Sequence, residues 1–239
     1  MGALHAGHGS LFKIASEYSS DVVASIFVNP LQFEETSDLE NYPRTPEKDM
    51  ALAEEYGVTH LWLPTATEIY PHGFTQLTAG PISKLYEGAS RAGHFDGVVT
   101  VVRRLFDLVK PNVAIFGEKD FQQLALVREI ADEVKIIAAP IVREDDGLAM
   151  SSRNIRLSAE GRVASRVISR ALRDSQSEGE LREVLSTEPM LTVDYADYID
   201  ERTFLPPTAS TQFTRAIVAG WINGVRLLDN MAVKQGGQR

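Results

Sequence analysis

In the first part of the chain, short apolar runs alternate with segments whose apolar residues recur at helical spacing. No other feature of the sequence restricts the possible folds as much as this alternation. Runs rich in β-branched and apolar residues are expected to form buried strands at 22–28, 59–63, 112–116 and 134–139. Apolar residues recur at helical spacing in 47–56, 97–110 and 120–132. Strands and helices in this order predict an α/β fold, with a Rossmann-like parallel sheet and helices on both of its faces.

The order of elements changes after a polar loop at 143–153. Helices are expected first, at 159–174 and 180–185, and short strands follow at 194–199, 214–219 and 226–228. Helices followed by strands predict a smaller α+β domain. We therefore expect two domains, residues 1–142 and residues 143–239.

The chain begins with MGALHAGHGSL, which has the character of a loop and not of a strand. A parallel nucleotide-binding sheet normally begins with a strand. Either the first strand of this sheet is missing from the sequence, as we expect, or another element takes its place.

Composition argues against several classes of partner and site. The net charge is −9, and no run of basic residues is longer than Arg103-Arg104, so nucleic acid is not an expected partner. There are no cysteines, which excludes disulfides and thiolate chemistry and fits a reducing compartment such as the cytoplasm. We read no signal peptide and no apolar run of the roughly 18 residues that a bilayer requires, so no membrane association is expected.

Two histidines, His5 and His8, flank a glycine just before a helix that is expected from Ser10 onward. The free N–H groups and the dipole of a helix N-terminus favour an anion there, and two imidazoles would add donors. The pattern H-x-x-H is weak, and surface histidines at a frayed terminus explain it equally well. A zinc site would need a third ligand that the spacing does not supply.

Two later turns carry groups suited to phosphate. Lys119, in Gly117-Glu118-Lys119-Asp120, could neutralise phosphate charge, although Asp120 and Gln123 also have the spacing of a capping box. Met150-Ser151-Ser152-Arg153 offers hydroxyls and a guanidinium, although an ordinary hinge with a helix cap at Ser158 is the simpler interpretation.

Three further polar residues are candidates. The neutral amides of Gln32 and Gln123 could orient a hydroxyl or carboxylate, although each is unremarkable by itself. Asp49 is expected to be solvated on its helix, with metal contact as a lesser possibility.

Six segments occur in a fixed order: MGALHAGH, SIFVNPLQF, YPRTP, HFDGVVTVV, FGEKDFQQL and VREDDGLAMSSRN. Together they closely resemble the pantoate–β-alanine ligase (pantothenate synthetase) family of the nucleotidyltransferase-like α/β superfamily, whose members use an H-x-G-H element and a late K-M-S-K-S type loop. The resemblance extends from Met1 to about Leu157, and more loosely beyond it through DYADYID and VRLLDN.

The resemblance implies roles for particular residues. His8 would be the proton donor, His5 and Lys119 would contact phosphates, and Arg153 would close with its mobile loop on the triphosphate. Gln32 and Gln123 would hold pantoate, and Gln32 would also lie near β-alanine. ATP contacts are implied for Met1, Gly2, Ala3, Leu4, His5, Ala6, Gly7, His8, Gly117, Glu118, Lys119, Asp120, Val142, Met150, Ser151, Ser152 and Arg153.

The implied reaction is the ATP-dependent formation of an amide from pantoate and β-alanine through an acyl-adenylate, with release of AMP and diphosphate. ATP is then a co-substrate and Mg²⁺ a cofactor, with Asp49 as a possible metal ligand. Residues 1–142 would bind ATP and pantoate, residues 143–239 would act as a lid, and the protein would be a homodimer.

The sequence departs from the family pattern in two places. The expected first strand is missing, and Gly9 stands where the family usually has an apolar residue. Two alternatives therefore remain: a nucleotidyltransferase of the same superfamily that releases a nucleotidylated product, and a truncated nucleotide-binding protein without catalytic activity.

Overall fold

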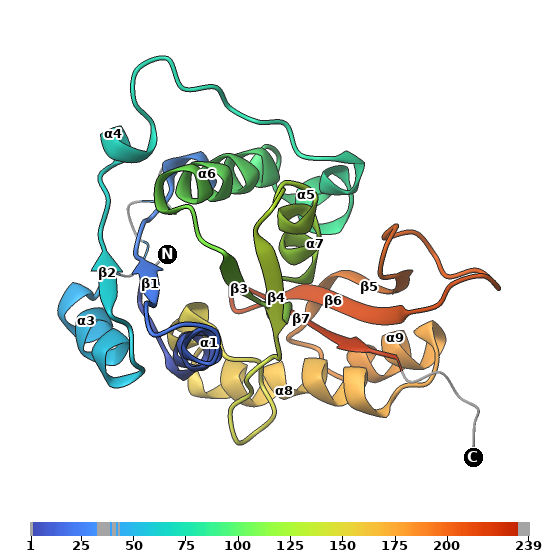
Figure 1. Cartoon of the computed structure of the whole chain (residues 1–239). Helices are drawn as coiled ribbons and strands as arrows, with labels where there is room; N and C mark the ends of the chain where they lie inside the picture. Colours follow the sequence, from blue (N-terminus) through green and yellow to red (C-terminus); the bar gives the residue numbers. More distant parts are fainter. Residues whose placement is uncertain (1, 33–38, 40–41, 43, 234–239) are drawn as a thin grey trace. The chain divides into compact units, whose positions relative to one another are not determined.

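The computed structural model describes residues 2–32, 39, 42 and 44–233. By their internal contacts the residues form two compact units, Met1–Ile141 and Val142–Arg239. Each unit has its own strands and helices (Figure 1).

The strands of the first unit are all paired in parallel. Strand β1 (Val23–Ser25) pairs with β2 (His60–Trp62), and β3 (Val113–Gly117) pairs with β4 (Lys135–Ala139). Within the described part of the chain these are two separate two-stranded sheets, and no strand connects one pair to the other. The predicted α/β fold with parallel strands is confirmed, but the strands form two pairs instead of one continuous sheet.

Helices connect and cover these strands, as parallel pairing requires. Figure 1 shows α1 and α6 on opposite sides of the β3–β4 pair. The helices of the unit are α1 (Ala6–Ser16), α3 (Pro46–Glu55), α4 (Ala66–Ile69), α5 (Tyr86–Ser90), α6 (His94–Val109) and α7 (Phe121–Glu129). Short 3-10 turns lie at η1 (Pro30–Gln32), η2 (Pro81–Lys84) and η3 (Glu118–Asp120).

The first helix begins earlier than its sequence predicts. We expected it from Ser10 onward, but α1 starts at Ala6 because the His5 side chain caps it and accepts a hydrogen bond from the Gly7 N–H. The histidine motif therefore forms the first turn of the helix and does not precede it.

The second unit is an antiparallel sheet covered by two helices, which confirms the predicted α+β architecture. Its strands, in spatial order, are β5 (Thr192–Asp200), β6 (Thr214–Ile222) and β7 (Val225–Ala232). Its helices are α8 (Ala159–Asp174) and α9 (Glu178–Ser186), and a 3-10 turn, η4 (Ser152–Arg156), precedes them.

The core of this unit lies between the helices and one face of the sheet. Ile168, Leu181, Leu185 and Val218 are at most 1% exposed there. Strands β6 and β7 are joined by Asn223 and Gly224, both at positive φ, as a two-residue hairpin turn requires. No helix in the described ranges is both long and apolar enough to cross a membrane.

Candidate active site

The two motif histidines hold each other in place at the N-terminus of α1. His5 Nδ1 accepts a hydrogen bond from the Gly7 N–H at 3.1 Å, and His8 Nδ1 accepts one from the His5 N–H at 3.2 Å. The ring centroids lie 4.1 Å apart. Because both Nδ1 atoms accept from backbone donors, each neutral imidazole carries its proton on Nε2.

The charge state of His8 follows from its surroundings. Burial, followed by the neighbouring His5, lowers the pKa of His8 to about 3. The charge of Asp120 raises this pKa and that of Lys119 lowers it, so the turn after β3 lies close enough to act on the imidazole. At neutral pH His8 is therefore uncharged and offers an N–H donor.

Asp49 fixes the segment immediately before α1. Its carboxylate accepts hydrogen bonds from the Ala3 N–H at 3.0 Å, the Leu4 N–H at 2.7 Å and the Thr45 hydroxyl at 3.0 Å. Asp49 is only 1% exposed, so our expectation of a solvated side chain is wrong. No local pattern could have signalled the contacts with Ala3 and Leu4, because these partners lie 46 and 45 positions away.

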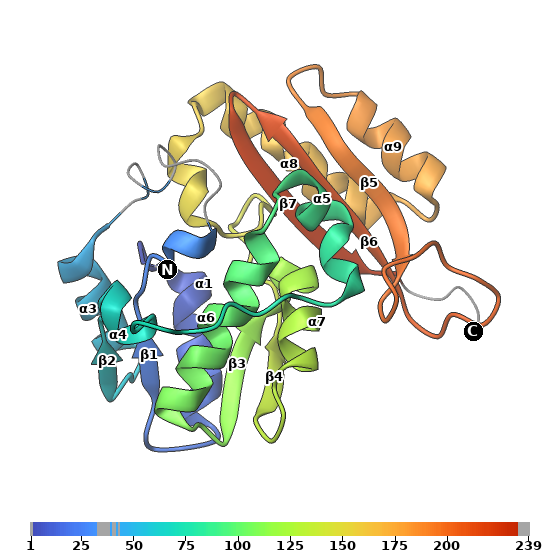
Figure 2. The same ribbon diagram turned by 90° about the horizontal axis from the view of Figure 1, so that it is seen from above.

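Lys119 lies in η3, directly after β3. Its side chain is 20% exposed, and its Nζ is 3.9 Å from Asp120 Oδ1. The capping box that the spacing of Asp120 and Gln123 suggested is not formed, since Asp120 makes no side-chain capping hydrogen bond to α7. Helix α1 packs against β3, the strand that precedes this turn (Figure 2).

Gln32 lies in η1, and its backbone is held from several sides. The side chain of Asn29 accepts from the Leu31 N–H at 3.2 Å and donates to the Gly97 carbonyl at 3.1 Å. The Gln32 carbonyl accepts from His94 Nδ1 at 3.1 Å. Gln32 itself is 7% exposed. Asn29, Gly97 and His94 were not among the predicted residues, although they determine where Gln32 lies.

Two adjacent glutamines in α7 have different surroundings. The Gln122 amide donates to the carbonyls of Ile82 and Leu85 and accepts from the Glu87 N–H, and Gln122 is 6% exposed. Gln123, the predicted substrate contact, is half-buried one position further along. Gln122 therefore anchors η2 and the start of α5, and the structure distinguishes it from Gln123.

The predicted ATP contacts from Val142 onward belong to the second unit. The Met150 N–H donates to the Val142 carbonyl at 2.9 Å, so these two predicted ATP contacts are neighbours. Ser151 caps η4 and accepts from the Arg153 N–H at 3.3 Å. The helix cap predicted at Ser158 is confirmed, because its hydroxyl accepts from the Gly161 N–H at 3.0 Å. Met1 lies outside the described residues.

The described residues do not form a protein-built magnesium site. They contain no group of three or more His, Asp or Glu side chains arranged to hold a metal ion. Both Asp49 oxygens already accept hydrogen bonds from the protein. Mg²⁺ commonly binds proteins mainly through substrate phosphates, and it is treated below as part of the ATP substrate.

The first unit therefore presents two adjacent imidazoles at the N-terminus of α1 and a lysine whose charge acts on one of them, His8. The helix dipole, the imidazole N–H donors and the ammonium all favour an anion of the phosphate type. The arrangement can bind and stabilise negative charge, and among the described residues it contains no activated side-chain nucleophile of the kind that covalent catalysis requires.

Comparisons with known proteins agree with one another. A family model described as pantoate-beta-alanine ligase matches residues 1–232. The pantothenate synthetase of Chlorobaculum tepidum is 43% identical over 249 residues, which cover 96% of this chain and 88% of that protein. That of Stenotrophomonas maltophilia is 44% identical and covers 97% of this chain and 88% of that protein.

Solved structures show the same similarity. The crystal structure of pantothenate synthetase from Thermus thermophilus is 43% identical, with a TM-score of 0.92 over 98% of this chain and 91% of that chain. That of pantoate-beta-alanine ligase from Francisella tularensis, complexed with beta-gamma ATP and beta-alanine, is 33% identical, with a TM-score of 0.84 over 99% of this chain and 88% of that chain.

Proposed function

Because the chain belongs to the pantoate–β-alanine ligase family, we propose that it condenses (R)-pantoate with β-alanine to pantothenate through a pantoyl-adenylate formed from ATP. AMP and diphosphate are the by-products. The observation that carries this proposal is the group of N–H and ammonium donors around the N-terminus of α1, which suits a triphosphate.

In the first step the pantoate carboxylate attacks the α-phosphorus of ATP, and the bond from that phosphorus to diphosphate breaks. Two anions must approach each other, so catalysis depends on neutralising and positioning charge. Lys119 supplies the positive charge in the first unit. His5 and His8 donate hydrogen bonds from Nε2 to the phosphates.

The neutral state of His8 refines its proposed role. With a pKa of about 3, the His8 imidazole is neutral at pH 7. Its remaining proton, on Nε2, is too weakly acidic to be transferred readily. His8 therefore meets ATP as a hydrogen-bond donor that can stabilise the pentavalent phosphorus, and its proposed role as proton donor requires the phosphate charges to raise its pKa.

In the second step the amine of β-alanine attacks the acyl carbon of the mixed anhydride. The bond to AMP breaks, and the proton that the amine loses as the amide forms passes to water. Gln32 and Gln123 are proposed to hold pantoate in both steps. The amide groups orient the hydroxyls and carboxylate of pantoate without adding charge.

The remaining assignments complete the proposal. Gly2–His8 and Gly117–Asp120 contact ATP, Val142 contacts adenine through its backbone, and Met150–Arg153 contacts the phosphates. Residues 1–142 bind ATP and pantoate, and residues 143–239 act as the lid domain. Mg²⁺ enters with ATP, the active protein is a homodimer, and it works in the cytoplasm.

The direct test is an assay of the purified protein with MgATP, pantoate and β-alanine. We expect AMP and diphosphate in equal amounts, and AMP formation that requires pantoate. AMP formation without pantoate would contradict the ligase assignment. A nucleotidylated end product would identify a nucleotidyltransferase, and ATP binding without turnover would identify the non-catalytic alternative.

The role of Lys119 is tested by a matched pair of variants. Lys119→Ala should lower kcat/KM at least roughly tenfold, because it removes a charge on the phosphates. Lys84→Ala removes the same charge from an exposed residue of the same unit and should leave the rate unchanged. Equal rates for the two variants would refute the assignment of Lys119.

A further inference from the structure

A tight hairpin immediately precedes the Met150–Arg153 segment. Arg143 and Ala149 form an antiparallel bridge, and the Glu144 N–H donates to the Leu148 carbonyl at 2.9 Å. Gly147 turns the chain at a φ of +89°, which a residue with a side chain rarely adopts. The hairpin therefore determines where the chain enters Met150.

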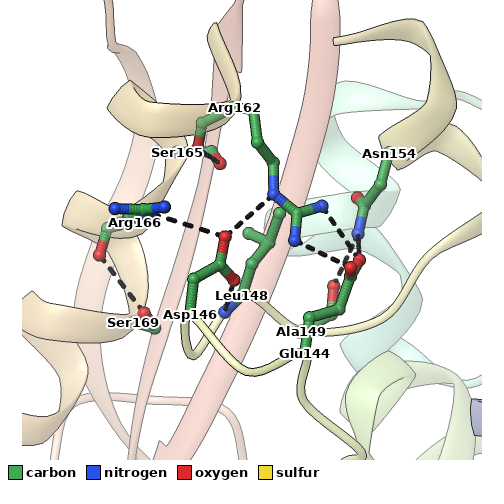
Figure 3. Close-up of polar contacts among 9 residues, drawn as sticks. All are labelled: Glu144, Asp146, Leu148, Ala149, Asn154, Arg162, Ser165, Arg166 and Ser169. Carbon is green, nitrogen blue, oxygen red and sulfur yellow. Dashed lines mark hydrogen bonds and ion pairs between the residues drawn. The ribbon is translucent and has the colours of Figure 1, made fainter. Parts of the chain in front are cut away.

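Arg162 of α8 binds two acidic residues of this hairpin, Glu144 and Asp146. Its two terminal nitrogens contact the Glu144 carboxylate, with Nη1 to Oε1 at 3.0 Å and Nη2 to Oε2 at 2.7 Å. Its Nε donates to Asp146 Oδ2 at 2.9 Å. Figure 3 shows the guanidinium between the two carboxylates. A planar fork of donors can make these three contacts at once, and a lysine cannot.

Asn154 connects the same carboxylate to the far end of the segment. Its Nδ2 donates to Glu144 Oε1 at 2.9 Å and to the Ala149 carbonyl at 3.1 Å (Figure 3). Its backbone N–H closes the turn on the Ser151 carbonyl at 3.0 Å. Asn154 is 8% exposed. Ala149 and Asn154 bracket the four residues between them, so the Asn154 amide ties the two ends of Met150–Arg153 together and is itself held by the Glu144 carboxylate.

Arg162 and Glu144 both remain charged at neutral pH. The hydrogen bond from Arg162 lowers the pKa of Glu144, and the bond from Asn154 lowers it further against the opposing effect of burial. Hydrogen bonding to Glu144 raises the pKa of Arg162 above its usual value. Both groups therefore remain ionised over the range in which an ATP-dependent enzyme works.

We propose that Arg162 is a positioning residue, which acts through Glu144 and Asn154 to hold Met150–Arg153 in the conformation that binds the phosphates of ATP. This inference rests on the proposed function of that segment. Arg162 does not itself contact substrate. It sets the geometry of residues that do, and small displacements of such residues are costly to the rate.

Three variants on one helix test the proposal. Arg162→Lys keeps the charge and the helix but cannot make the forked contact. Arg162→Ala removes the contact altogether. Arg166→Ala is the matched control, because Arg166 lies one turn further along α8, is 51% exposed, and contacts Asp146 at 3.4 Å through its Nε. Arg166 has no contact with Glu144 among the described ion pairs.

Two readouts separate positioning from general stability. In steady-state kinetics, Arg162→Lys and Arg162→Ala should raise the KM for ATP by roughly tenfold or more, while the KM for β-alanine stays within about twofold. In hydrogen exchange of the ligand-free protein, the amides of Met150 and Asn154 should lose protection in both variants. Arg166→Ala should match the wild type in both measurements.

Other outcomes decide against the proposal. Unchanged exchange at Met150 and Asn154 in Arg162→Ala would overturn it, whatever the activity. Equal rises in KM for all three substrates, or equal effects in Arg166→Ala, would also overturn it. If the wild type proved inactive but the Arg162 variants still lost exchange protection at Met150 and Asn154, the ligase proposal would be refuted. The inference that Arg162 positions Met150–Arg153 would be supported.

Discussion

Gly97 lies where η1 crosses α6, and replacing it with alanine tests whether this close approach positions Gln32. A Cβ added to Gly97 would lie 2.2 Å from the Leu31 carbonyl oxygen, 2.5 Å from the carbonyl carbon and 3.0 Å from the Gln32 nitrogen. These are backbone atoms, so no flexible side chain can move aside. Either α6 or η1 must shift.

The size of the effect follows from these distances. Carbon and oxygen atoms in contact normally lie about 3.3–3.6 Å apart, so the two backbones must separate by roughly 1 Å. Overpacking of this kind costs about 1–3 kcal/mol, and the better helix propensity of alanine offsets about 1 kcal/mol of it. We expect a net loss of up to about 2 kcal/mol in the free energy of unfolding.

The same shift should appear in catalysis. Because Gln32 is proposed to hold pantoate, a displacement of about 1 Å should raise the KM for pantoate by roughly tenfold or more. The KM for ATP should change much less, since Lys119 lies in η3, which follows β3 and is a separate element from η1. Urea unfolding and steady-state kinetics measure the two quantities.

Gly179→Ala provides the control. Gly179 also lies in a helix, α9, but its added Cβ would meet only Ser177 Oγ, at 4.0 Å. The substitution should stabilise the protein by up to about 1 kcal/mol through helix propensity and leave the kinetics unchanged. If Gly97→Ala proves as stable as Gly179→Ala and binds pantoate normally, the packing argument for Gln32 is refuted.

Three further predictions concern the first unit. Between pH 6.5 and about 3, His8 binds a proton in the unfolded chain but not in the folded protein. The free energy of unfolding should therefore fall as the pH is lowered, by up to about 2 kcal/mol from pH 7 to 5. In urea unfolding, the free energy of unfolding of His8→Asn should depend less on pH. Asp49→Ala leaves two backbone N–H groups before α1 without their acceptor and should cost about 2–4 kcal/mol and most of the activity, whereas Asp49→Asn, which retains one acceptor, should lose less in both assays. Gln122→Ala should lower the thermal midpoint because it removes the buried amide that bonds the carbonyls of Ile82 and Leu85 and the Glu87 N–H, whereas Gln123→Ala should raise only the KM for pantoate; the reverse pattern would exchange their roles.

The sequence alone determined the local elements, because their signals are local. Helix α8 was predicted at 159–174 and found at Ala159–Asp174, where Ser158 caps it. Helix α3 begins at Pro46, which has no N–H to lose in the first turn. The apolar, β-branched runs became the parallel strands for the same reason, since their pattern is complete within a few residues. The motif order likewise identified the family before any fold was known.

Tertiary structure decided the features that depend on partners distant in the sequence. Strand β7 was expected only at 226–228, but it extends to Ala232 because pairing with β6 satisfies the backbone of Asp229 and Asn230, whose polar side chains interrupt the apolar pattern. The Asp229 carboxylate is in turn neutralised by Arg143, 86 positions away. No local pattern encodes such a contact.

The same physical reason applies at the site. Composition and spacing could place His5, His8 and Lys119 at the ends of elements, where backbone donors are unpaired. They could not show that burial keeps His8 neutral, that Asp49 holds the chain before α1, or that Arg162 ties Glu144 to Asn154. Burial and long-range hydrogen bonds exist only once the chain has folded, and they set the charge and the position of each group that the sequence had named.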